Sequence, residues 1–504
     1  MKQLAQKNIL VLGLGASGLA LARWCARCGA RVTVADTRAE PPQLSKLQAS
    51  VPTARFIHAE MNDALLTTDA FDLVLKSPGL SPASVAGVIA AAIAGGIACG
   101  SELSLFAQAL ADLKEERAYA PKVIAITGTN GKTTVTSLTA LLVQRAGKSV
   151  AVAGNIGPTL LDTLGEKLDE KQGDEALPAL PDVWVLELSS FQLDGIDNFE
   201  PTVAALLNVT QDHLDWHETL PKYVAAKSRV FGHTGLMLLN RNDPLVMAAL
   251  PPPVKGRQLR EYVTFGSDEP QRPGDYGIET VNGMAWLVRA AAADETVKRR
   301  KVEEAALYIQ RLMPQEALRI RGRHNATNAL AALALAVAVD CTLAPMLHGL
   351  RDYKGEPHRV ESIAVVNDIE YFDDSKGTNV GATVAALAGL GPERKLVVIL
   401  GGEGKGQNFS PLVEVVSRYA RAVVLIGRDA PLIRSALQSS DVPLLDAVSM
   451  RDAVAVATQQ ARGGDAVLMS PACASFDMFD NYEHRAQVFC DAVQALAHNE
   501  GVLL

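Results

Sequence analysis

The chain has little of what stabilises small secreted proteins. Its six cysteines are scattered over 504 residues, and segment 1–7 is too short and polar for a secretion signal, so we expect a reducing cytoplasm and no disulfide framework. Cys25 and Cys28 lie in an expected helix, without a second cysteine or histidine pair at metal-ligand spacing. Packing in a core is therefore preferred to a redox or zinc pair.

Long apolar runs and an excess of positive charge are also missing. No run of about 18 uncharged apolar residues stands out, and the alanine-rich stretch 328–339 has only the length of a core helix. The chain has 48 lysines and arginines against 56 aspartates and glutamates, a net charge of −8. This balance argues against membrane insertion and against nonspecific nucleic-acid binding. We expect small-molecule partners and a monomer.

Short apolar strands alternate with helical segments along most of the chain. Segment 8–12 has the pattern of a strand, 17–28 that of a helix and 31–36 that of a second strand. The same alternation resumes in the middle and in the last third. It predicts an α/β fold with mainly parallel sheets covered by helices.

The length and the charge pattern predict three domains. A chain of 504 residues exceeds what one hydrophobic core usually organises. Charged clusters that interrupt the alternation place the domains at 1–112, 113–343 and 344–504. Segments 161–182 and 268–318 are rich in charge, proline or glycine. We expect them to be surface elaborations without chemistry.

Segment 128–134 reads Gly-Thr-Asn-Gly-Lys-Thr-Thr and joins an apolar strand to a helix. Glycines let backbone N–H groups converge on an anion, and the following helix offers its positive end. Lys132 supplies a charge and Thr133 a hydroxyl that can bind magnesium. Two residues separate its two glycines, whereas the common P-loop has four. The segment therefore predicts a phosphate site of an uncommon, shortened type.

Three residues of the middle third are weaker candidates for chemistry. Glu187 ends a strand among apolar residues, where an unpaired charge is costly, and this favours a magnesium ligand over a solvent-facing strand end. His213 lies between Asp212 and Asp215, and such residues can bind a metal or orient a nucleophile, but a functional role and no function stay equally open. Lys227 lies on an expected helix, where a lysine usually has a solvated end.

The N-terminal strand runs into Gly13-Leu-Gly15-Ala-Ser-Gly18, and Asp36 ends the next strand. This is the full context of a dinucleotide fingerprint. NAD is one ligand that it fits. The motif itself offers a diphosphate site beside a carboxylate, so a UDP group fits equally well, and a tight turn without a ligand is a third interpretation.

Small, polar and basic residues cluster at further points of the chain, several of them at expected strand ends. Such points suit anions, although some can be plain turns. The clusters are 323–325 (Arg-His-Asn), 358–359 (His-Arg), 373–379, 401–406 and 470–477.

Together these motifs resemble the Mur ligase family of ATP-dependent amide ligases, in order and over essentially the whole chain. The short phosphate loop, Gly154-Asn155-Ile-Gly157, Glu187-Leu-Ser-Ser-Phe-Gln and Asp212-His213 match its central domain. Asp374-Ser-Lys376-Gly-Thr378-Asn379 and Ser470-Pro-Ala-Cys-Ala-Ser475 are most similar to its D-glutamate-adding branch. Tyr482 stands where that branch often has Phe, and Arg485-Ala replaces Arg-Gly.

The resemblance implies a Rossmann-like UDP-binding first domain, an ATP-binding second domain and a Rossmann-like third domain that closes over both. It assigns ATP to Gly128, Thr129, Asn130, Gly131, Lys132, Thr133, Thr134, Asn325, Arg359, Asp374 and Lys376. It assigns the UDP-linked substrate to Ala16, Ser17, Gly18, Asp36, Thr37, Arg38, Gly79 and Asn155. It assigns D-glutamate to Thr378, Lys405, Ser475 and Tyr482, and Mg²⁺ to Thr133, Glu187, His213 and a carbamylated Lys227. Lys132, Glu187, His213 and Lys227 are its catalytic residues.

The implied reaction joins UDP-N-acetylmuramoyl-L-alanine to D-glutamate through an acyl phosphate, in cytoplasmic peptidoglycan precursor synthesis. Three alternatives remain open. One is a sister ligase for another amino acid, or an enzyme similar to folylpolyglutamate synthase. The others are an NAD-binding dehydrogenase or sensor, which the first motif alone supports, and a P-loop switch without ligase chemistry.

Overall fold

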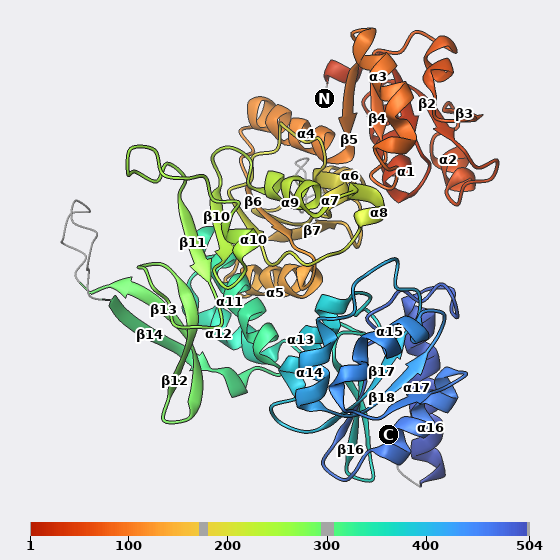
Figure 1. Ribbon diagram of the computed structural model, residues 1–504. Helices are drawn as coiled ribbons and strands as arrows, with labels where there is room; N and C mark the ends of the chain where they lie inside the picture. Colours follow the sequence, from red (N-terminus) through yellow and green to blue (C-terminus); the bar gives the residue numbers. More distant parts are fainter. Residues whose placement is uncertain (1, 171–179, 294–306, 501–504) are drawn as a thin grey trace. The chain divides into compact units, whose positions relative to one another are not determined.

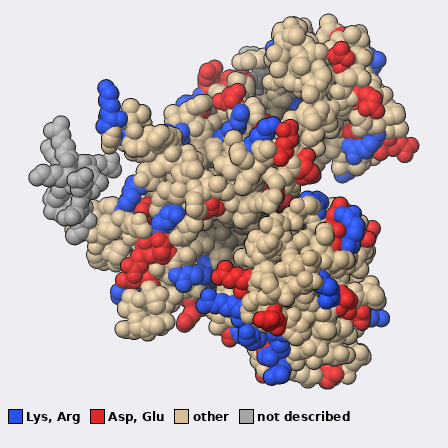
Figure 2. Space-filling view, viewed as in Figure 1, with Lys and Arg blue, Asp and Glu red and all other residues tan. Residues whose placement is uncertain are grey.

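The computed structural model describes residues 2–170, 180–293 and 307–500 (Figure 1). Its contacts divide the chain into two compact units, which are described separately. The first contains residues 1–209, 213–265 and 331–349, and the second contains 210–212, 266–330 and 350–504. Figure 2 shows acidic and basic side chains spread over the visible face, as the mixed charge composition implies.

The first unit begins with a parallel five-stranded sheet of order β3-β2-β1-β4-β5. Side chains alternate along β1: Ile9 and Val11 pack into the core with α1, whereas Leu10 and Leu12 pack into the core with α3. The elements are β1 Asn8–Leu12, α1 Ala16–Arg27, β2 Arg31–Asp36, α2 Leu44–Ser50, β3 Arg55–His58, β4 Leu73–Lys76, α3 Ala86–Ala94, β5 Ala98–Ser101 and α4 Glu102–Arg117. The chain reverses its direction of strand addition at β1 and β4, and ligands of such sheets collect there, outside the carboxyl ends of the strands.

A second parallel sheet of the first unit has the order β11-β10-β9-β6-β8-β7. Every residue of β8 is buried, as expected for a strand covered on both faces. The elements are β6 Lys122–Thr127, α5 Lys132–Arg145, β7 Val150–Gly154, α6 Leu160–Asp169, β8 Val183–Glu187, α7 Ser190–Leu193, β9 Val203–Leu206, α8 Leu214–His217, α9 Leu220–Ser228, β10 Leu236–Asn240, α10 Pro244–Met247 and β11 Tyr262–Phe265. Helices α11 Arg323–Ala338 and α12 Leu343–Asp352 follow later in the chain.

The second unit contains a six-stranded sheet of order β15-β16-β20-β17-β18-β19, parallel except for the β15–β16 hairpin. Helices α13 and α14 contribute to one core of this sheet, and α16 and α17 contribute to the other. The elements are β15 Glu361–Val366, β16 Ile369–Asp373, α13 Val380–Leu390, β17 Leu396–Gly401, α14 Leu412–Tyr419, β18 Ala420–Ile426, α15 Ala430–Leu437, β19 Leu444–Asp446, α16 Met450–Gln460, β20 Ala466–Met469 and α17 Tyr482–Asn499.

The two segments expected to be surface elaborations are more structured than the sequence suggested. Within 161–182, helix α6 buries Leu161 and Leu164, because its apolar residues recur on one face. Within 268–318, the strands β12 Tyr276–Val281, β13 Met284–Ala292 and β14 Leu307–Pro314 pair antiparallel. Their buried side chains include Ile278, Leu287 and Met313. Residues 171–179 and 294–306 of these segments lie outside the described part of the chain.

The alanine-rich stretch and the cysteines take the positions that the sequence predicted. Eight successive residues of α11, 329–336, are buried in the core, and in the described ranges no helix has the length and apolarity to cross a membrane. All six cysteines are free. Cys25 is fully buried in the core, where burial raises the pKa of its thiol to about 12. Cys25 therefore serves packing.

Candidate active site

The phosphate-type loop connects β6 to α5 and is held by Asn208, which follows β9. The Asn208 side chain accepts from the backbone N–H of Asn130 at 2.8 Å and donates to its carbonyl at 3.0 Å. The Asn208 carbonyl accepts from Thr129 N–H at 2.9 Å. These bonds tie the short loop to the end of the neighbouring strand β9. The amides at the start of α5 then lie at a helix N-terminus, where an anion is favoured.

Two lysines converge on the carbonyl oxygen of Gly128. Lys132 Nζ donates to Gly128 O and to Thr129 O, both at 2.9 Å, so this lysine folds back on its own loop. Lys227 Nζ, from α9, donates to Gly128 O at 2.8 Å and lies 4.6 Å from the centre of the Tyr223 ring. The loop therefore has positive charge on two sides.

The burial of Lys227 corrects the interpretation drawn from the residue pattern alone. A lysine on a helix usually has a solvated end, but Lys227 is only 1% exposed. Helix α9 packs against α7 and α8, and the Lys227 ammonium lies against Gly128 O and the Tyr223 ring rather than in solvent. Burying an ammonium group costs free energy unless polar or aromatic groups compensate its charge. The Gly128 carbonyl and the Tyr223 ring provide part of this compensation.

Glu187 lies at the carboxyl end of β8 and is 3% exposed, which excludes a solvent-facing strand end. Its Oε1 accepts from Asn155 Nδ2 at 3.0 Å, and its carbonyl accepts from the Asn155 backbone at 2.8 Å. Gly154, just before Asn155, has φ +128°, and a Cβ there would lie 2.1 Å from Glu187 O. Only glycine lets the two strands approach this closely. The structure thus brings Glu187 and Asn155 together.

His213 directly precedes the short helix α8 as its N-cap, in the left-handed region with φ +53°. Its ring lies 4.8 Å from that of Phe191 and 6.4 Å from that of Tyr223, so the sequence-predicted histidine belongs to an aromatic cluster. His217 belongs to the same cluster and is bonded to Ser190 Oγ at 2.8 Å. Burial lowers the pKa of His217 to about 4, so it is neutral at physiological pH.

The N-terminal glycine loop is closed by Asp36, the last residue of β2. Asp36 accepts from Leu14 N–H at 2.7 Å and from Arg38 Nε and Nη2, each at 2.8 Å. Burial alone would raise the pKa of Asp36, but these donors lower it to about 2. A Cβ on Gly18 would lie 1.9 Å from Gly13 O, so the third glycine permits the close helix–strand approach expected for this motif.

The second unit brings together two residues that the resemblance assigns to the nucleotide. Asn325 and Arg359 line one polar cavity of about 450 Å³. The Asn325 side chain donates to Arg321 O at 2.8 Å, which fixes its orientation. The charged lining of the cavity is mixed, with four basic residues, Arg359, Arg319, Arg321 and Lys354, and three acidic ones, Glu356, Glu361 and Glu370. A cavity of this volume, lined by polar and charged groups, suits a small polar ligand.

Asp374 follows β16 and is buried. Its Oδ2 accepts from Ser470 Oγ at 2.6 Å. Burial raises the pKa of Asp374 to about 7, although the Ser470 hydroxyl and the charge of Arg359 lower it. Two residues further along the chain, Lys376 Nζ lies 3.5 Å from the centre of the Tyr482 ring. This contact brings a residue that the resemblance assigns to the nucleotide beside one that it assigns to D-glutamate.

Two further loops meet through backbone pairing. Glu403 and Ala474 exchange two N–H···O bonds of 2.9 Å, which bring the loop carrying Lys405 beside the loop carrying Ser475. The buried Arg485 donates to Cys473 O at 3.1 Å and to Ser375 O at 2.9 Å. It therefore ties the 470–475 loop to the loop that carries Thr378. The sequence drew attention to position 485 only as a departure from a pattern.

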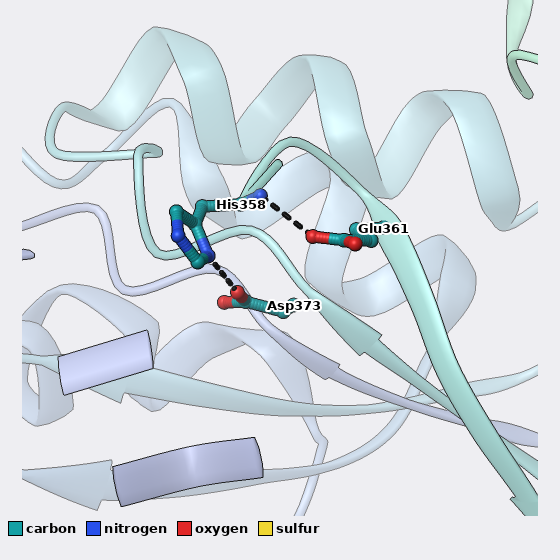
Figure 3. A group of neighbouring side chains, drawn as sticks. All are labelled: His358, Glu361 and Asp373. Carbon is teal, nitrogen blue, oxygen red and sulfur yellow. Dashed lines mark hydrogen bonds and ion pairs between the residues drawn. The ribbon is translucent and has the colours of Figure 1, made fainter. Parts of the chain in front are cut away.

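A cluster that the sequence did not predict is formed by His358, Glu361 and Asp373 (Figure 3). His358 Nδ1 lies 2.7 Å from Asp373 Oδ2, and Glu361 accepts from the His358 backbone N–H at 2.9 Å. Asp373 also accepts from Ser375 N–H at 2.9 Å. Asp373 thus orients the imidazole, and Glu361 holds the backbone of the same residue. The sequence singled out 358–359 and 373–379 as separate clusters but did not bring them together, because fifteen residues separate His358 from Asp373.

Parallel sheets, a glycine-lysine loop at a helix N-terminus and a buried acid at the neighbouring strand end define a nucleotide-binding α/β protein of the P-loop type. Comparison of the chain with models of protein families identifies the family within this class. The Mur ligase middle domain matches residues 126–336, the MurD-like N-terminal domain matches 7–100, and the Mur ligase glutamate ligase domain matches 358–473. The chain belongs to the Mur ligase family. The dehydrogenase alternative is not supported, because the N-terminal loop lies within a Mur ligase domain.

Whole-length relatives agree with this assignment. A UDP-N-acetylmuramoylalanine–D-glutamate ligase of Albidiferax ferrireducens is 67% identical, covering 99% of this chain and 98% of the relative. A protein of the same name from Burkholderia cenocepacia is 56% identical, covering 98% of each chain. Among solved structures, the UDP-N-acetylmuramate-alanine ligase MurC of Thermotoga maritima has a TM-score of 0.54 at 19% identity, covering 97% of this chain and 100% of that chain.

A second solved structure, MurF ligase from Thermotoga maritima in complex with ADP, has a TM-score of 0.55 at 15% identity. It covers 99% of this chain and 97% of that chain. At these identities the two likenesses show the fold. The three-domain α/β architecture expected from the sequence is therefore confirmed.

Proposed function

We propose that this protein is an ATP-dependent ligase that joins D-glutamate to UDP-N-acetylmuramoyl-L-alanine in peptidoglycan precursor synthesis. The observation that carries the proposal is the first unit's constellation of a shortened phosphate loop, two lysines on Gly128 O and the buried Glu187–Asn155 pair. The whole-length likeness to D-glutamate ligases, 67% identical in one case, supports the choice of amino acid.

The reaction needs activation of a carboxylate, because its negative charge repels a nucleophile. The L-alanyl carboxylate of the UDP-linked substrate attacks the γ-phosphorus of ATP, which forms an acyl phosphate and releases ADP. Residues 128–134 hold the phosphates, and Lys132 leaves its carbonyl partners to neutralise the charge that develops on the transferred phosphoryl group. Contacts of this kind contribute about 3 kcal/mol each to transition-state stabilisation.

The residues around the loop fit a magnesium ion. Thr133 offers a hydroxyl and Glu187 a buried carboxylate, and oxygen donors are those that magnesium prefers. The side-chain partner described for Glu187 is the neutral Asn155, so its charge is not compensated by that contact. His213 and a carbamylated Lys227 complete the proposed set. Magnesium, when bound, neutralises the β- and γ-phosphates.

The D-glutamate amine attacks the acyl carbon, and the tetrahedral intermediate expels phosphate to leave the amide. His213 positions the amine or removes its proton. Thr378, Lys405, Ser475 and Tyr482 hold D-glutamate. The contact of Lys376 with the Tyr482 ring and the Glu403–Ala474 pairing support a common site for these loops within the second unit.

The two nucleotide moieties occupy different sites in this proposal. UDP binds at Ala16, Ser17, Gly18, Asp36, Thr37, Arg38 and Gly79, and Asn155 contacts the muramoyl group. Asn325 and Asp374 hold the adenosine of ATP, and Arg359 and Lys376 hold its phosphates. The shared cavity of Asn325 and Arg359 supports the second assignment.

The proposed division of labour follows the expected domains: 1–112 binds the UDP-linked substrate, 113–343 binds ATP, and 344–504 binds D-glutamate and nucleotide. Residue 112 lies within α4, so this helix links the first two. The third closes over the others, because an acyl phosphate must be kept from water. The protein acts in the cytoplasm as a monomer.

The proposal is tested by product analysis. Purified protein is incubated with ATP, magnesium and UDP-N-acetylmuramoyl-L-alanine, and D-glutamate, L-glutamate, L-lysine or meso-diaminopimelate is added singly. Mass spectrometry should find the D-glutamyl amide with D-glutamate alone. A product with one of the other amino acids would assign the protein to a sister activity, and nucleotide hydrolysis indifferent to every amino acid would contradict ligase chemistry.

A further inference from the structure

A short turn in the second unit holds two loops that the proposed reaction uses, although no residue of the turn has a part in that reaction. The turn, residues 427–429 (Gly-Arg-Asp), joins β18 to α15. Strands β17 and β18 lie side by side in parallel and end together at Gly401 and Ile426 (Figure 1). The turn therefore lies beside the loop that follows β17, which carries Lys405.

Asp429 holds the backbone of the Lys405 loop at two points. Its Oδ2 accepts from the backbone N–H of Gly404 at 2.7 Å, and its own backbone N–H donates to Gly402 O at 3.1 Å. Asp429 is the N-cap residue of α15, but its side chain makes no capping hydrogen bond to that helix. Its Oδ1 lies 3.5 Å from the exposed Arg428 guanidinium, a pair that contributes little. The carboxylate therefore serves the loop rather than its own helix.

The backbone next to this contact has a conformation that needs support. Lys405 directly follows Gly404 and has φ +51°, in the left-handed region that a lysine rarely adopts. Gly404 O accepts from Gln407 N–H at 3.0 Å, which closes a turn around Lys405. A strained residue keeps its conformation where the surrounding contacts fix it. The bond from Gly404 N–H to Asp429 fixes the start of this turn.

The same turn also reaches the loop that carries Ser475. Asp477 Oδ2 accepts from the backbone N–H of Arg428 at 2.8 Å. Gly427 has φ +78°, and a Cβ there would lie 2.6 Å from Asp477 Oδ2 and 2.8 Å from Gly402 N. Only glycine lets both loops approach the turn this closely.

The Lys405 side chain extends toward this second loop. Its Nζ lies 5.8 Å from the centre of the Phe476 ring, and Phe476 directly follows Ser475. The turn thus supports two of the proposed D-glutamate loops on one side, and Lys405 points from the first of them to the second.

We propose that Asp429 is a positioning residue for Lys405. By fixing the Gly404 amide, it holds the Lys405 ammonium where that group pairs with a carboxylate of D-glutamate. Asp429 itself makes no contact with the substrate. Loss of its carboxylate should therefore weaken binding of D-glutamate and leave ATP and the UDP-linked substrate, which other loops hold, bound as before. This inference rests on the proposed function for the identity of the ligand.

The test measures steady-state kinetics of the Asp429→Ala variant with each of the three substrates varied in turn. We expect KM for D-glutamate to rise tenfold or more, and the KM values for ATP and for the UDP-linked substrate to change less than twofold. Asp429→Asn keeps an oxygen that can accept from the Gly404 N–H. It should hold KM for D-glutamate within threefold of the wild-type value.

A double variant separates positioning of Lys405 from a general effect on the fold. Lys405→Ala removes the group that is to be positioned, so KM for D-glutamate should rise in this variant. Adding Asp429→Ala to Lys405→Ala should then change that KM less than twofold, because no ammonium is left to misplace. A role in stability alone would instead raise KM by the same factor in both backgrounds.

Two further variants serve as controls. Asp446→Asn removes an exposed ion pair with Arg434 in the same unit and should leave all three KM values within twofold of the wild type. Asp429→Ser replaces the alanine variant if that variant does not fold. Serine is a favourable N-cap residue, and its side chain is one bond too short to replace the carboxylate oxygen at Gly404.

Three results would overturn the inference: an unchanged KM for D-glutamate in Asp429→Ala, an equal rise of all three KM values, or an undiminished effect of Asp429→Ala in the Lys405→Ala background. Failure of the wild type to use D-glutamate would instead contradict the proposed function. A wild type that uses D-glutamate, with an Asp429→Ala variant that matches it, contradicts only the role of Asp429.

Discussion

Lys227 Nζ, on α9, donates to the carbonyl oxygen of Gly128 at 2.8 Å, although 99 residues separate them in the chain. The contact places a buried lysine against the loop that holds the proposed γ-phosphate. The proposed carbamate forms when the neutral Lys227 amine adds to carbon dioxide and loses a proton, which replaces a buried cation by a carboxylate-like anion. Such a group is a suitable magnesium ligand beside Glu187.

Incubation with ¹³C-labelled bicarbonate should therefore give a carbamate carbon signal by NMR in the wild type. Lys227→Ala should lose both this signal and the ligase activity, because the second magnesium ligand is gone. Lys222→Ala is the matched control: Lys222 lies on the same helix, paired with the exposed Glu218, and its loss should change neither. A labelled signal that persists in Lys227→Ala would show that the modification is elsewhere.

Lys132→Ala should reduce kcat by about 100-fold or more, since removal of one preorganised charge from a transition state costs about 3 kcal/mol. The KM for ATP should rise less, because backbone amides of the loop still bind the phosphates. Steady-state kinetics with all three substrates measures both. Turnover of Lys132→Ala at the wild-type rate would show that Lys132 does not stabilise the transition state of phosphoryl transfer.

Much of this site could be predicted from the sequence, because its loops follow strands whose apolar pattern is clear. The Gly128 loop, the Gly13 loop and Glu187 all lie at the carboxyl ends of parallel strands, where ligands collect. Lys227 could not be placed from its residue pattern, since its side chain bonds the Gly128 carbonyl, 99 residues earlier in the chain.

Other features depend on contacts between segments distant in sequence. The His358–Asp373 pair forms only because β15 folds back on β16. Segment 268–318 looked like a charged elaboration because its last strand, β14, exposes Tyr308, Gln310 and Arg311, and composition alone does not distinguish such a strand from a loop.

The pH dependence of stability should carry a contribution from Asp374. Burial raises its pKa to about 7, above the value of about 3.9 of an unfolded aspartate. At a pH between these two pKa values, the folded protein keeps the Asp374 proton that the unfolded chain has released. The stabilisation from Asp374 is therefore fully present at low pH and is lost as the pH rises toward 7. Its slope cannot exceed about 1.4 kcal/mol per pH unit.

Chemical denaturation of the wild type and of Asp374→Asn, from pH 4.5 to 8, checks this prediction. The contributions of all other groups are common to both proteins, so the stability difference between them isolates Asp374. The variant should gain stability relative to the wild type as pH rises. Parallel pH profiles would show that Asp374 titrates in its ordinary range.

Gly154→Ala should destabilise the protein by about 2 kcal/mol or more, because the position requires a positive φ and the new Cβ meets the Glu187 carbonyl. It should also displace Asn155 and weaken binding of the UDP-linked substrate. Gly165→Ala is the control, in the interior of α6 with nothing within 4 Å of its Cβ. That substitution should stabilise by about 0.5–1 kcal/mol, and thermal unfolding of both variants tests the contrast.

The most direct test of the central claim follows an oxygen atom. If the substrate carboxylate attacks the γ-phosphorus, UDP-N-acetylmuramoyl-L-alanine labelled with ¹⁸O in both carboxylate oxygens must pass one label to phosphate during amide formation. We predict phosphate with one ¹⁸O for each product molecule, detected by mass spectrometry. Unlabelled phosphate from the labelled substrate, with its new oxygen derived from water, would contradict the acyl-phosphate account.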